Sequence, residues 1–270
     1  MRPVLFQIPT PFGTFPVSSF GVFLLLAFIV AIFMTRARTN RLGWDPGEVV
    51  DLSLYAIIGG IVGARIGYVL VNLKDFVVLP ARVLMIWVDA GLTFYGALAG
   101  GAVVAWAYGR RRGWHLGQIA DAAAPGLAVG YAIAMIGALL YGLNYGRPAH
   151  VPWAVMLFGE PRHPTQLYLA AAGLVVFGIL RSVDRGVQGT GRVFWLFVLL
   201  MAVARFGIEF FMDSTRFRGL TMAQLISLVA AVVAAAMWYA RGRSLPAEGR
   251  VEASLPGAPV APPNAGGSHP

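Results

Sequence analysis

The sequence predicts an all-α polytopic membrane protein with seven transmembrane helices, a periplasmic N-terminus and a cytoplasmic C-terminus. Of the 270 residues, 58% are hydrophobic and only 12% are charged, whereas soluble domains carry about 25% charged residues. The mean hydropathy is +0.70. The chain has no cysteine, which excludes a disulfide framework, a thiolate metal site and a cysteine nucleophile.

The spans are predicted from the length of the apolar runs. A helix needs about 20 mostly apolar residues to cross roughly 30 Å of hydrocarbon. The first run resembles a secretory signal, but it is long and its basic cluster follows it, so we interpret it as an uncleaved anchor. The seven predicted spans are 17–35, 49–71, 92–108, 118–141, 165–180, 192–212 and 221–240.

The orientation follows from the positions of the basic residues, because cytoplasmic loops are enriched in Lys and Arg. With the N-terminus outside, the inner segments hold twelve of these residues and the outer segments seven. The net charge of +9 lies in short breaks between spans, so we exclude nucleic-acid binding. We expect one transmembrane domain, 1–240, with a long outer loop at 142–164, and a disordered cytoplasmic tail, 241–270, rich in Pro, Ala and Gly.

Glycines recur every four residues in three of the predicted spans. Gly59, Gly63 and Gly67 line one stripe of the second span, and Gly96 with Gly100 repeats the spacing in the third. The pair 126 and 130 does so in the fourth. Such stripes let neighbouring backbones approach closely. Packing within one bundle is favoured here over oligomerisation.

Two arginines, Arg65 and Arg205, lie inside predicted spans, where a charge needs a partner or a water-filled cavity. Glu209 follows Arg205 by four residues, and Asp213 follows Glu209 by four, so the three share one helix face. One alternative is that Arg205 and Glu209 only neutralise each other. Both arginines lie at similar depths below the outer ends of their spans, so we expect them to share one cavity.

Other polar side chains are predicted to gather at the same outer level. Arginines with few carboxylates beside them suit an anion, because guanidinium groups match phosphate oxygens. The anion available at that depth is a phospholipid headgroup. No metal site is predicted. The polar residues expected in or beside this outer region are Tyr95, Arg147, Arg162, His163, Gln166 and Tyr168.

Four runs carry a resemblance to a known family. APGLAVG, YGLNYGRPAHVPWAV, PRHPTQLY and GRVFWLFVLLMAVARFGIEFF resemble, in order and spacing, the bacterial prolipoprotein diacylglyceryl transferases, and GARIGYVL in the second span does so too. The resemblance extends over residues 19–213. It implies a seven-span inner-membrane enzyme that transfers diacylglyceryl from phosphatidylglycerol to the lipobox cysteine of a preprolipoprotein and releases glycerol phosphate. It implies no cofactor.

The resemblance also implies roles for particular residues. Arg205 would hold the phosphate, Glu209 would orient Arg205, and Tyr95 stands where the family has its histidine. His163 is either catalytic or a loop residue that holds the turn before Pro164. The residues implied in substrate binding are Arg65, Arg147, Arg162, Gln166, Tyr168, Gly142 and Gly146.

Several polar positions of the family are replaced in this chain. Met135 and Ala138 stand where the family has Arg and Asn, Met201 stands for a Tyr, and Leu143 for a Glu. These losses motivate a second hypothesis, a paralogue that binds anionic phospholipid or a lipoprotein signal peptide without turnover. A seven-span receptor or transporter is less favoured, since the only lysine, Lys74, lies in a predicted outer loop.

Overall fold

A computed structural model describes residues 2–10, 13–40, 43–78, 80–83, 91–183, 190–217 and 219–243. Seven long helices in these residues match the seven predicted windows. The helices are α1 (Ser19–Thr39), α2 (Pro46–Val71), α4 (Phe94–Arg112), α5 (Leu116–Tyr141), α6 (Thr165–Val183), α7 (Arg192–Ile208) and α8 (Met222–Arg243).

Six of the seven long helices have the length and apolar composition to cross a membrane. The exception is α4, because glycines dilute its apolar residues and three arginines fill its last turn. The structure therefore supports an all-α polytopic membrane protein, with α4 packed along α2 as the seventh long helix.

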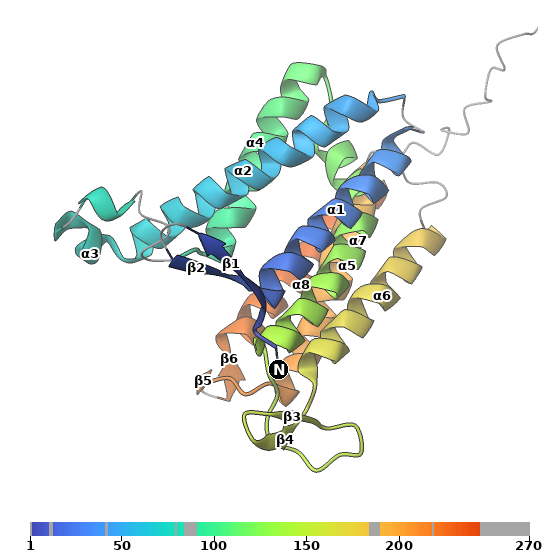
Figure 1. Ribbon diagram of the computed structural model, residues 1–270. Coiled ribbons are helices and arrows are strands. Elements are labelled where there is room, and N and C mark those ends of the chain that lie inside the picture. The colour runs from blue at the N-terminus through green and yellow to red at the C-terminus, as the bar shows by residue number, and fades with distance from the viewer. Residues whose placement is uncertain are drawn as a thin grey trace, which may run out of the picture.

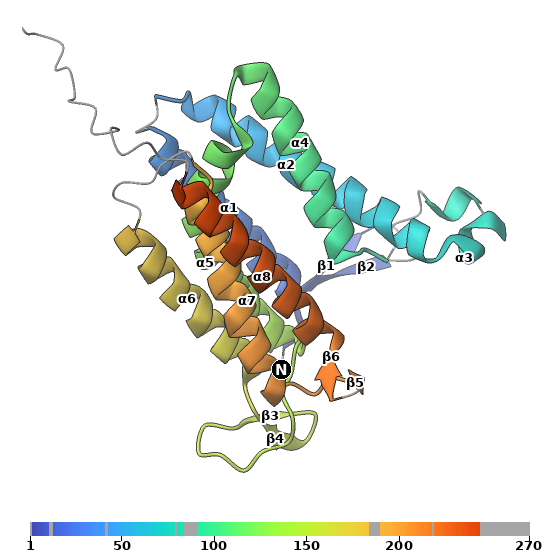
Figure 2. The ribbon, with the colours of Figure 1, turned by 180° about the vertical axis from the view of Figure 1, so that it is seen from behind.

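The helices form two groups (Figure 1). Helices α1, α5, α6, α7 and α8 form a bundle, with α5 packed against α1 and α6, and α7 against α8. Helices α2 and α4 pack mainly against each other, and their pair leans away from the bundle in both views (Figures 1 and 2). A short helix, α3 (Leu73–Val78), and a 3₁₀ turn, η2 (Pro80–Val83), connect this pair.

The predicted glycine stripes are confirmed as packing faces between helices. A Cβ atom added at Gly63 would overlap the backbone of Gly96 and Gly100 on α4. One added at Gly126 would meet the backbone of Ala31 on α1. The stripes thus join α2 to α4 and α5 to α1, as close approach of small residues allows.

Three short hairpins in the described residues lie outside the helices. Two of them, at 155–162 and 216–221, lie at one end of the bundle, which we call the hairpin end, and the remaining one projects from the bundle toward α2 (Figure 1). The strands β1 (Val4–Thr10) and β2 (Gly13–Ser18) form the first hairpin, tied to α5 by the Arg2 N–H, which donates to the Leu140 carbonyl. The others are β3 (Val155–Leu157) with β4 (Glu160–Arg162), and β5 (Arg216–Phe217) with β6 (Leu220–Thr221). The predicted outer loop at 142–164 is therefore partly a hairpin.

Two predicted boundaries differ from the structure. The sixth span was expected to continue to residue 212, but α7 ends at Ile208 and passes into a 3₁₀ turn, η4 (Glu209–Phe211). At the C-terminus, α8 continues to Arg243, and the Arg241 guanidinium donates to the Thr190 carbonyl at 2.6 Å. The disordered tail was predicted to start at residue 241, so its first three residues are helical instead, and residues 244–270 lie outside the described residues.

At the opposite end of the bundle, a buried carboxylate fixes the start of α7. Asp121 of α5 is 1% exposed and accepts hydrogen bonds from the backbone N–H groups of Gly191, at 2.7 Å, and Phe194, at 2.9 Å. A carboxylate suits this position because the first N–H groups of a helix lack intrahelical acceptors. This cap holds α7, and the residues that α7 carries, in register with α5.

Candidate functional site

Arg205 and Glu209 form an ion pair where α7 meets η4. Arg205 Nη2 lies 3.0 Å from Glu209 Oε2, but the N–H bond is not directed at that oxygen, so the contact is not an aligned hydrogen bond. Glu209 is 1% exposed, whereas 26% of the Arg205 side chain remains accessible. Arg205 occupies the last turn of α7, where the helix dipole favours a cation. Arg205 therefore lies nearer the end of its helix than the predicted span, 192–212, implied.

A tyrosine that the sequence analysis missed joins this pair. Tyr131 of α5 lies close enough to Arg205 and Glu209 to interact electrostatically with both. Its ring packs with Ile208 against a buried apolar cluster that includes Met135 and Ala138. The two positions where the resemblance expects Arg and Asn are thus part of this core.

Two glycines shape the backbone that follows α5. Gly142 ends α5 with a φ of 91°, a left-handed conformation that glycine adopts without strain. Gly146 pairs with Met212 in an isolated β-bridge, and a Cβ atom there would overlap the His163 carbonyl oxygen. The structure gives both glycines a backbone role, because they let the 142–164 segment lie against η4.

Arg162 lies within a network at the hairpin end. Its guanidinium donates to Asp213 at 2.8 Å, to Glu160 at 2.9 Å and to the Gly146 carbonyl at 3.2 Å, and it lies over the Tyr145 ring. The hydrogen bond to Asp213 raises the pKa of Arg162 above its ordinary value, so this side chain remains cationic at any physiological pH. Because two carboxylates already neutralise it, Arg162 attracts a further anion weakly.

Arg147 lies beside this network but is bound differently. Its Nε donates to the Met212 carbonyl at 3.1 Å, and its backbone N–H donates to the Phe211 carbonyl at 2.9 Å. No carboxylate pairs with it among the residues that the structure describes. At the hairpin end, Arg147 is thus better placed than Arg162 to attract an anion.

His163, Gln166 and Tyr168 lie where β4 leads into α6. His163 Nδ1 lies 3.1 Å from the Tyr168 hydroxyl, and its ring packs edge-on to Phe211 of η4. Gln166 is fully buried and donates to the Leu143 carbonyl at 2.7 Å. Its Oε1 atom has no hydrogen-bond partner within the described parts of the chain.

Arg65 and Tyr95 lie apart from this cluster, on the α2–α4 pair. Arg65 is 5% exposed, and its guanidinium donates to the carbonyls of Arg82, Val83 and Gly91 at 2.6–3.1 Å. Tyr95 is 57% exposed and stacks edge-on to Phe94. The expectation that Arg65 and Arg205 share one cavity is wrong for this structure, because helix depth alone says nothing about which neighbour a side chain faces.

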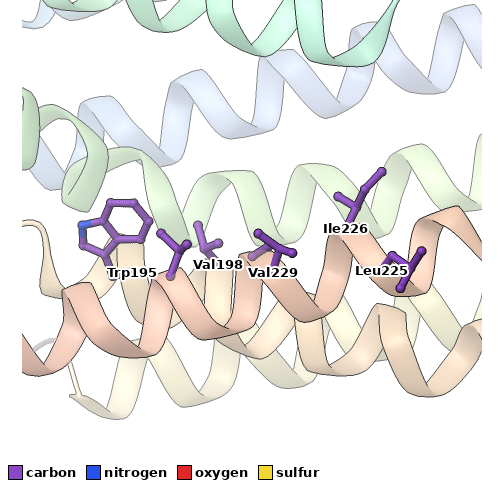
Figure 3. A pocket seen from close by; sticks show the side chains of 7 residues that line it. Trp195, Val198, Leu225, Ile226 and Val229 are labelled. Atoms are coloured by element: carbon purple, nitrogen blue, oxygen red, sulfur yellow. The ribbon is translucent and has the colours of Figure 1, made fainter.

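An apolar groove of about 460 Å³ runs between α7 and α8 (Figure 3). Its lining includes Trp195, Val198, Leu225, Ile226 and Val229, and every lining side chain is apolar or aromatic. This groove offers no polar group to a charged headgroup, unlike the cluster of arginines at the hairpin end. In the described ranges, no group of three His, Asp or Glu side chains has the arrangement of a metal site.

Comparisons with known proteins agree with the resemblance. Residues 3–240 match the family model described as prolipoprotein diacylglyceryl transferase, a range that includes all seven long helices except the end of α8.

The chain belongs to the prolipoprotein diacylglyceryl transferase family.

Individual relatives in this family cover most of the chain. It is 34% identical over 257 residues to the phosphatidylglycerol–prolipoprotein diacylglyceryl transferase of Methylococcus capsulatus, covering 88% of this chain and 97% of that protein. The enzyme of the same name from Chromohalobacter salexigens is 33% identical over 242 residues, covering 85% and 90%. That from Azoarcus sp. is 37% identical over 210 residues, covering 74% and 78%.

Three residues of structural interest were missed in the sequence. Asp121 lies inside a predicted apolar span, so the cost of a buried charge, used above for Arg205, could have identified it. Trp153, which contacts Tyr168, and Tyr131 gave no such signal, because a single aromatic residue in a loop or a span is common. Their positions depend on contacts between helices.

Proposed function

We propose that this transferase-family protein moves a diacylglyceryl group from phosphatidylglycerol to the lipobox cysteine thiol of a preprolipoprotein and releases glycerol phosphate. It would do so as a multi-pass protein of the bacterial inner membrane, with the hairpin end on the periplasmic side. The names of its relatives support both substrates. The distribution of basic residues supports the orientation.

The observation that carries this proposal is that Arg205 pairs with the fully buried Glu209, and that the segment containing Arg147 contacts the turn that begins at Glu209. The 142–164 segment meets η4 directly after Glu209, through the bond from Arg147 N–H to the Phe211 carbonyl. Cationic groups from α7 and from the segment after α5 therefore lie near one short turn. This arrangement suits an anionic headgroup that approaches from the membrane.

The proposed reaction requires negative charge to be stabilised on a leaving group. The substrate thiol loses its proton, its sulfur bonds to the glycerol carbon, and the carbon–oxygen bond to phosphate breaks with both electrons passing to that oxygen. Arg205 would hold the phosphate as charge develops, with Arg147 adding positive potential. Glu209 would orient Arg205 through their ion pair.

The remaining predicted residues take supporting roles in this proposal. Arg162, Gly142 and Gly146 hold the 142–164 segment against η4, and Arg65 holds the segment between α2 and α4. Gln166, which is fully buried, holds the start of α6 to the Leu143 carbonyl. Tyr95 would donate a hydrogen bond only to a substrate that reaches the exposed start of α4.

The apolar surroundings of Met135 and Ala138 favour a second candidate function. Both side chains are apolar and buried in a cluster with Leu169 and Ala170. Neither position therefore offers a substrate the polar group that Arg or Asn would supply. The alternative is a paralogue that binds phosphatidylglycerol or a signal peptide through its arginines without turnover.

The decisive experiment measures product directly. Purified protein in phosphatidylglycerol nanodiscs is given a lipobox peptide, and glycerol phosphate and lipidated peptide are measured by mass spectrometry. A peptide with Ser in place of the acceptor Cys is the substrate control. We expect both products with the Cys peptide, and Arg147→Gln to lower their rate while Arg181→Gln, at the opposite end of α6, leaves it unchanged. Phosphatidylglycerol binding without either product would establish the second candidate instead.

A further inference from the structure

A chain of hydrogen bonds links an exposed tryptophan to His163. Trp153, in the segment between α5 and β3, places its Nε1 atom 2.6 Å from the Tyr168 hydroxyl oxygen. The same hydroxyl lies 3.1 Å from His163 Nδ1. His163 and Tyr168 are five residues apart, whereas Trp153 comes from the segment before the β3–β4 hairpin and is brought to Tyr168 by that hairpin.

The direction of the first bond follows from the chemistry of the groups. An indole N–H can only donate, so the Tyr168 oxygen accepts from Trp153. The direction of the second bond depends on the tautomer of His163. Because the Tyr168 oxygen already accepts from Trp153, the arrangement favours Tyr168 as the donor to Nδ1. The lone pair of Nδ1 is then occupied, and the ring proton resides on Nε2.

Packing restrains the histidine ring as well. The Tyr168 and Phe211 rings lie edge-on to it, with centroid separations of 6.1 Å and 5.2 Å. Its backbone N–H donates to the Arg147 carbonyl, and its carbonyl accepts from the Thr165 N–H. His163 is therefore fixed to the same backbone as Arg147 and to the η4 turn that begins at Glu209.

We propose that Trp153 is a positioning residue that, through Tyr168, holds His163 in the tautomer protonated at Nε2. His163 then acts as a hydrogen-bond donor to an anionic oxygen of the substrate and does not remove the thiol proton. This role rests on the proposed transferase function, and it decides between the two interpretations of His163 left open by the sequence. The thiol proton passes to an acceptor outside this hydrogen-bond chain.

The test observes the tautomer directly. The full-length protein is labelled with ¹⁵N-histidine in nanodiscs, and the signals of His163 among the four histidines are assigned with His163→Gln. We expect an unprotonated Nδ1 and a protonated Nε2 in the wild type. Trp153→Phe keeps the ring but removes the N–H, so we expect a mixture of tautomers. Trp195→Phe, in the apolar groove of α7, is the matched control and leaves the tautomer unchanged.

Activity provides the second readout. Loss of one hydrogen bond in the chain predicts a fall in kcat of about 3- to 10-fold in Trp153→Phe, with an unchanged KM. Tyr168→Phe breaks the same chain, so the double variant is expected to lose no more than the larger single effect.

The proposal is overturned by a wild-type His163 protonated at Nδ1, or by a Trp153→Phe variant with the wild-type tautomer. Neither result depends on turnover, so the tautomer measurement tests this inference even if the protein transfers no lipid. Absence of transfer with the expected tautomer would refute the proposed function and leave the hydrogen-bond geometry intact.

Discussion

The α2–α4 pair and the hairpin end differ in how each binds an arginine that comes from an apolar helix, Arg65 of α2 and Arg205 of α7. Arg65 is 5% exposed and donates to three backbone carbonyls of the segment that joins α2 to α4. Arg205 keeps 26% of its side chain accessible and contacts one buried carboxylate at a poorly aligned angle. A guanidinium has five N–H donors. Arg65, whose N–H donors bind backbone carbonyls, is structural. Arg205, which contacts one carboxylate, keeps N–H donors for a ligand.

The largest effect is expected from the side chain with that capacity. Arg205→Gln should lower kcat/KM for lipid transfer by about 100- to 1000-fold, the range seen when one transition-state donor is removed. The double variant Arg205→Gln/Glu209→Gln removes the uncompensated carboxylate and serves as the control for folding. If the double variant regained activity, Arg205 would serve only to neutralise Glu209, and the comparison with Arg65 would fail.

Arg65 should show the opposite pattern. Arg65→Gln leaves buried carbonyls without donors, so we expect a loss of at least about 1.5–3 kcal/mol in stability. Activity per folded molecule should fall far less than in Arg205→Gln. Thermal unfolding in nanodiscs, measured with the transfer rate of the folded fraction, checks this. A loss of phosphatidylglycerol binding without a loss of stability would give Arg65 a direct role in the site.

The contribution of α2–α4 packing to stability can be measured separately from that of Arg65 by making the same Gly→Ala substitution at two positions. Gly63→Ala adds a Cβ that overlaps the backbone of Gly96, so we expect a destabilisation of about 1–3 kcal/mol. Gly178→Ala, on α6, meets no atom within 4 Å and should stabilise its helix by about 0.5–1 kcal/mol. Effects of the same sign at both positions, again by thermal unfolding, would refute the close approach of α2 and α4.

The smallest effect is expected at the opposite end of α7. Asp121→Asn retains one acceptor oxygen but removes the charge that caps this helix, so we expect a loss of about 0.5–2 kcal/mol. Arg205 lies in the last turn of α7, at the other end from this cap. If the cap only stabilises the helix, the KM for lipid should stay constant. Hydrogen exchange at the first turn of α7 provides the measurement.

Much of the fold could be predicted from the sequence. The long apolar runs predicted seven helices within a few residues of their ends, since the bilayer sets the length of such runs. The four-residue glycine spacing predicted the close contacts of α2 and α5. The end of α7 could not be predicted, because FGIEFF remains apolar enough for a helix and only the pairing of Met212 with Gly146 ends it.

The candidate site was predicted less well than the fold. Depth along a helix placed Arg65 and Arg205 at one level, but the direction that each side chain faces depends on its neighbours. Arg65 turns toward η2 and Gly91, where it donates to carbonyls, which every residue carries and no sequence pattern marks. The ion pair of Arg205 with Glu209 was predicted correctly, because a spacing of four residues is a local property.

The sequence by itself determined that the chain forms apolar helices, which helices approach closely and which acid lies beside Arg205. These properties depend on hydrophobicity and on spacing within one helix, both of which are local. The tertiary structure decided which arginine is held by the backbone, and it brought Tyr131 to Arg205 and Trp153 to His163 by way of Tyr168. Tyr131 and Arg205 come from helices distant in the chain, and the contact of Trp153 with Tyr168 spans the β3–β4 hairpin, so they form only when the helices have packed and that hairpin has closed.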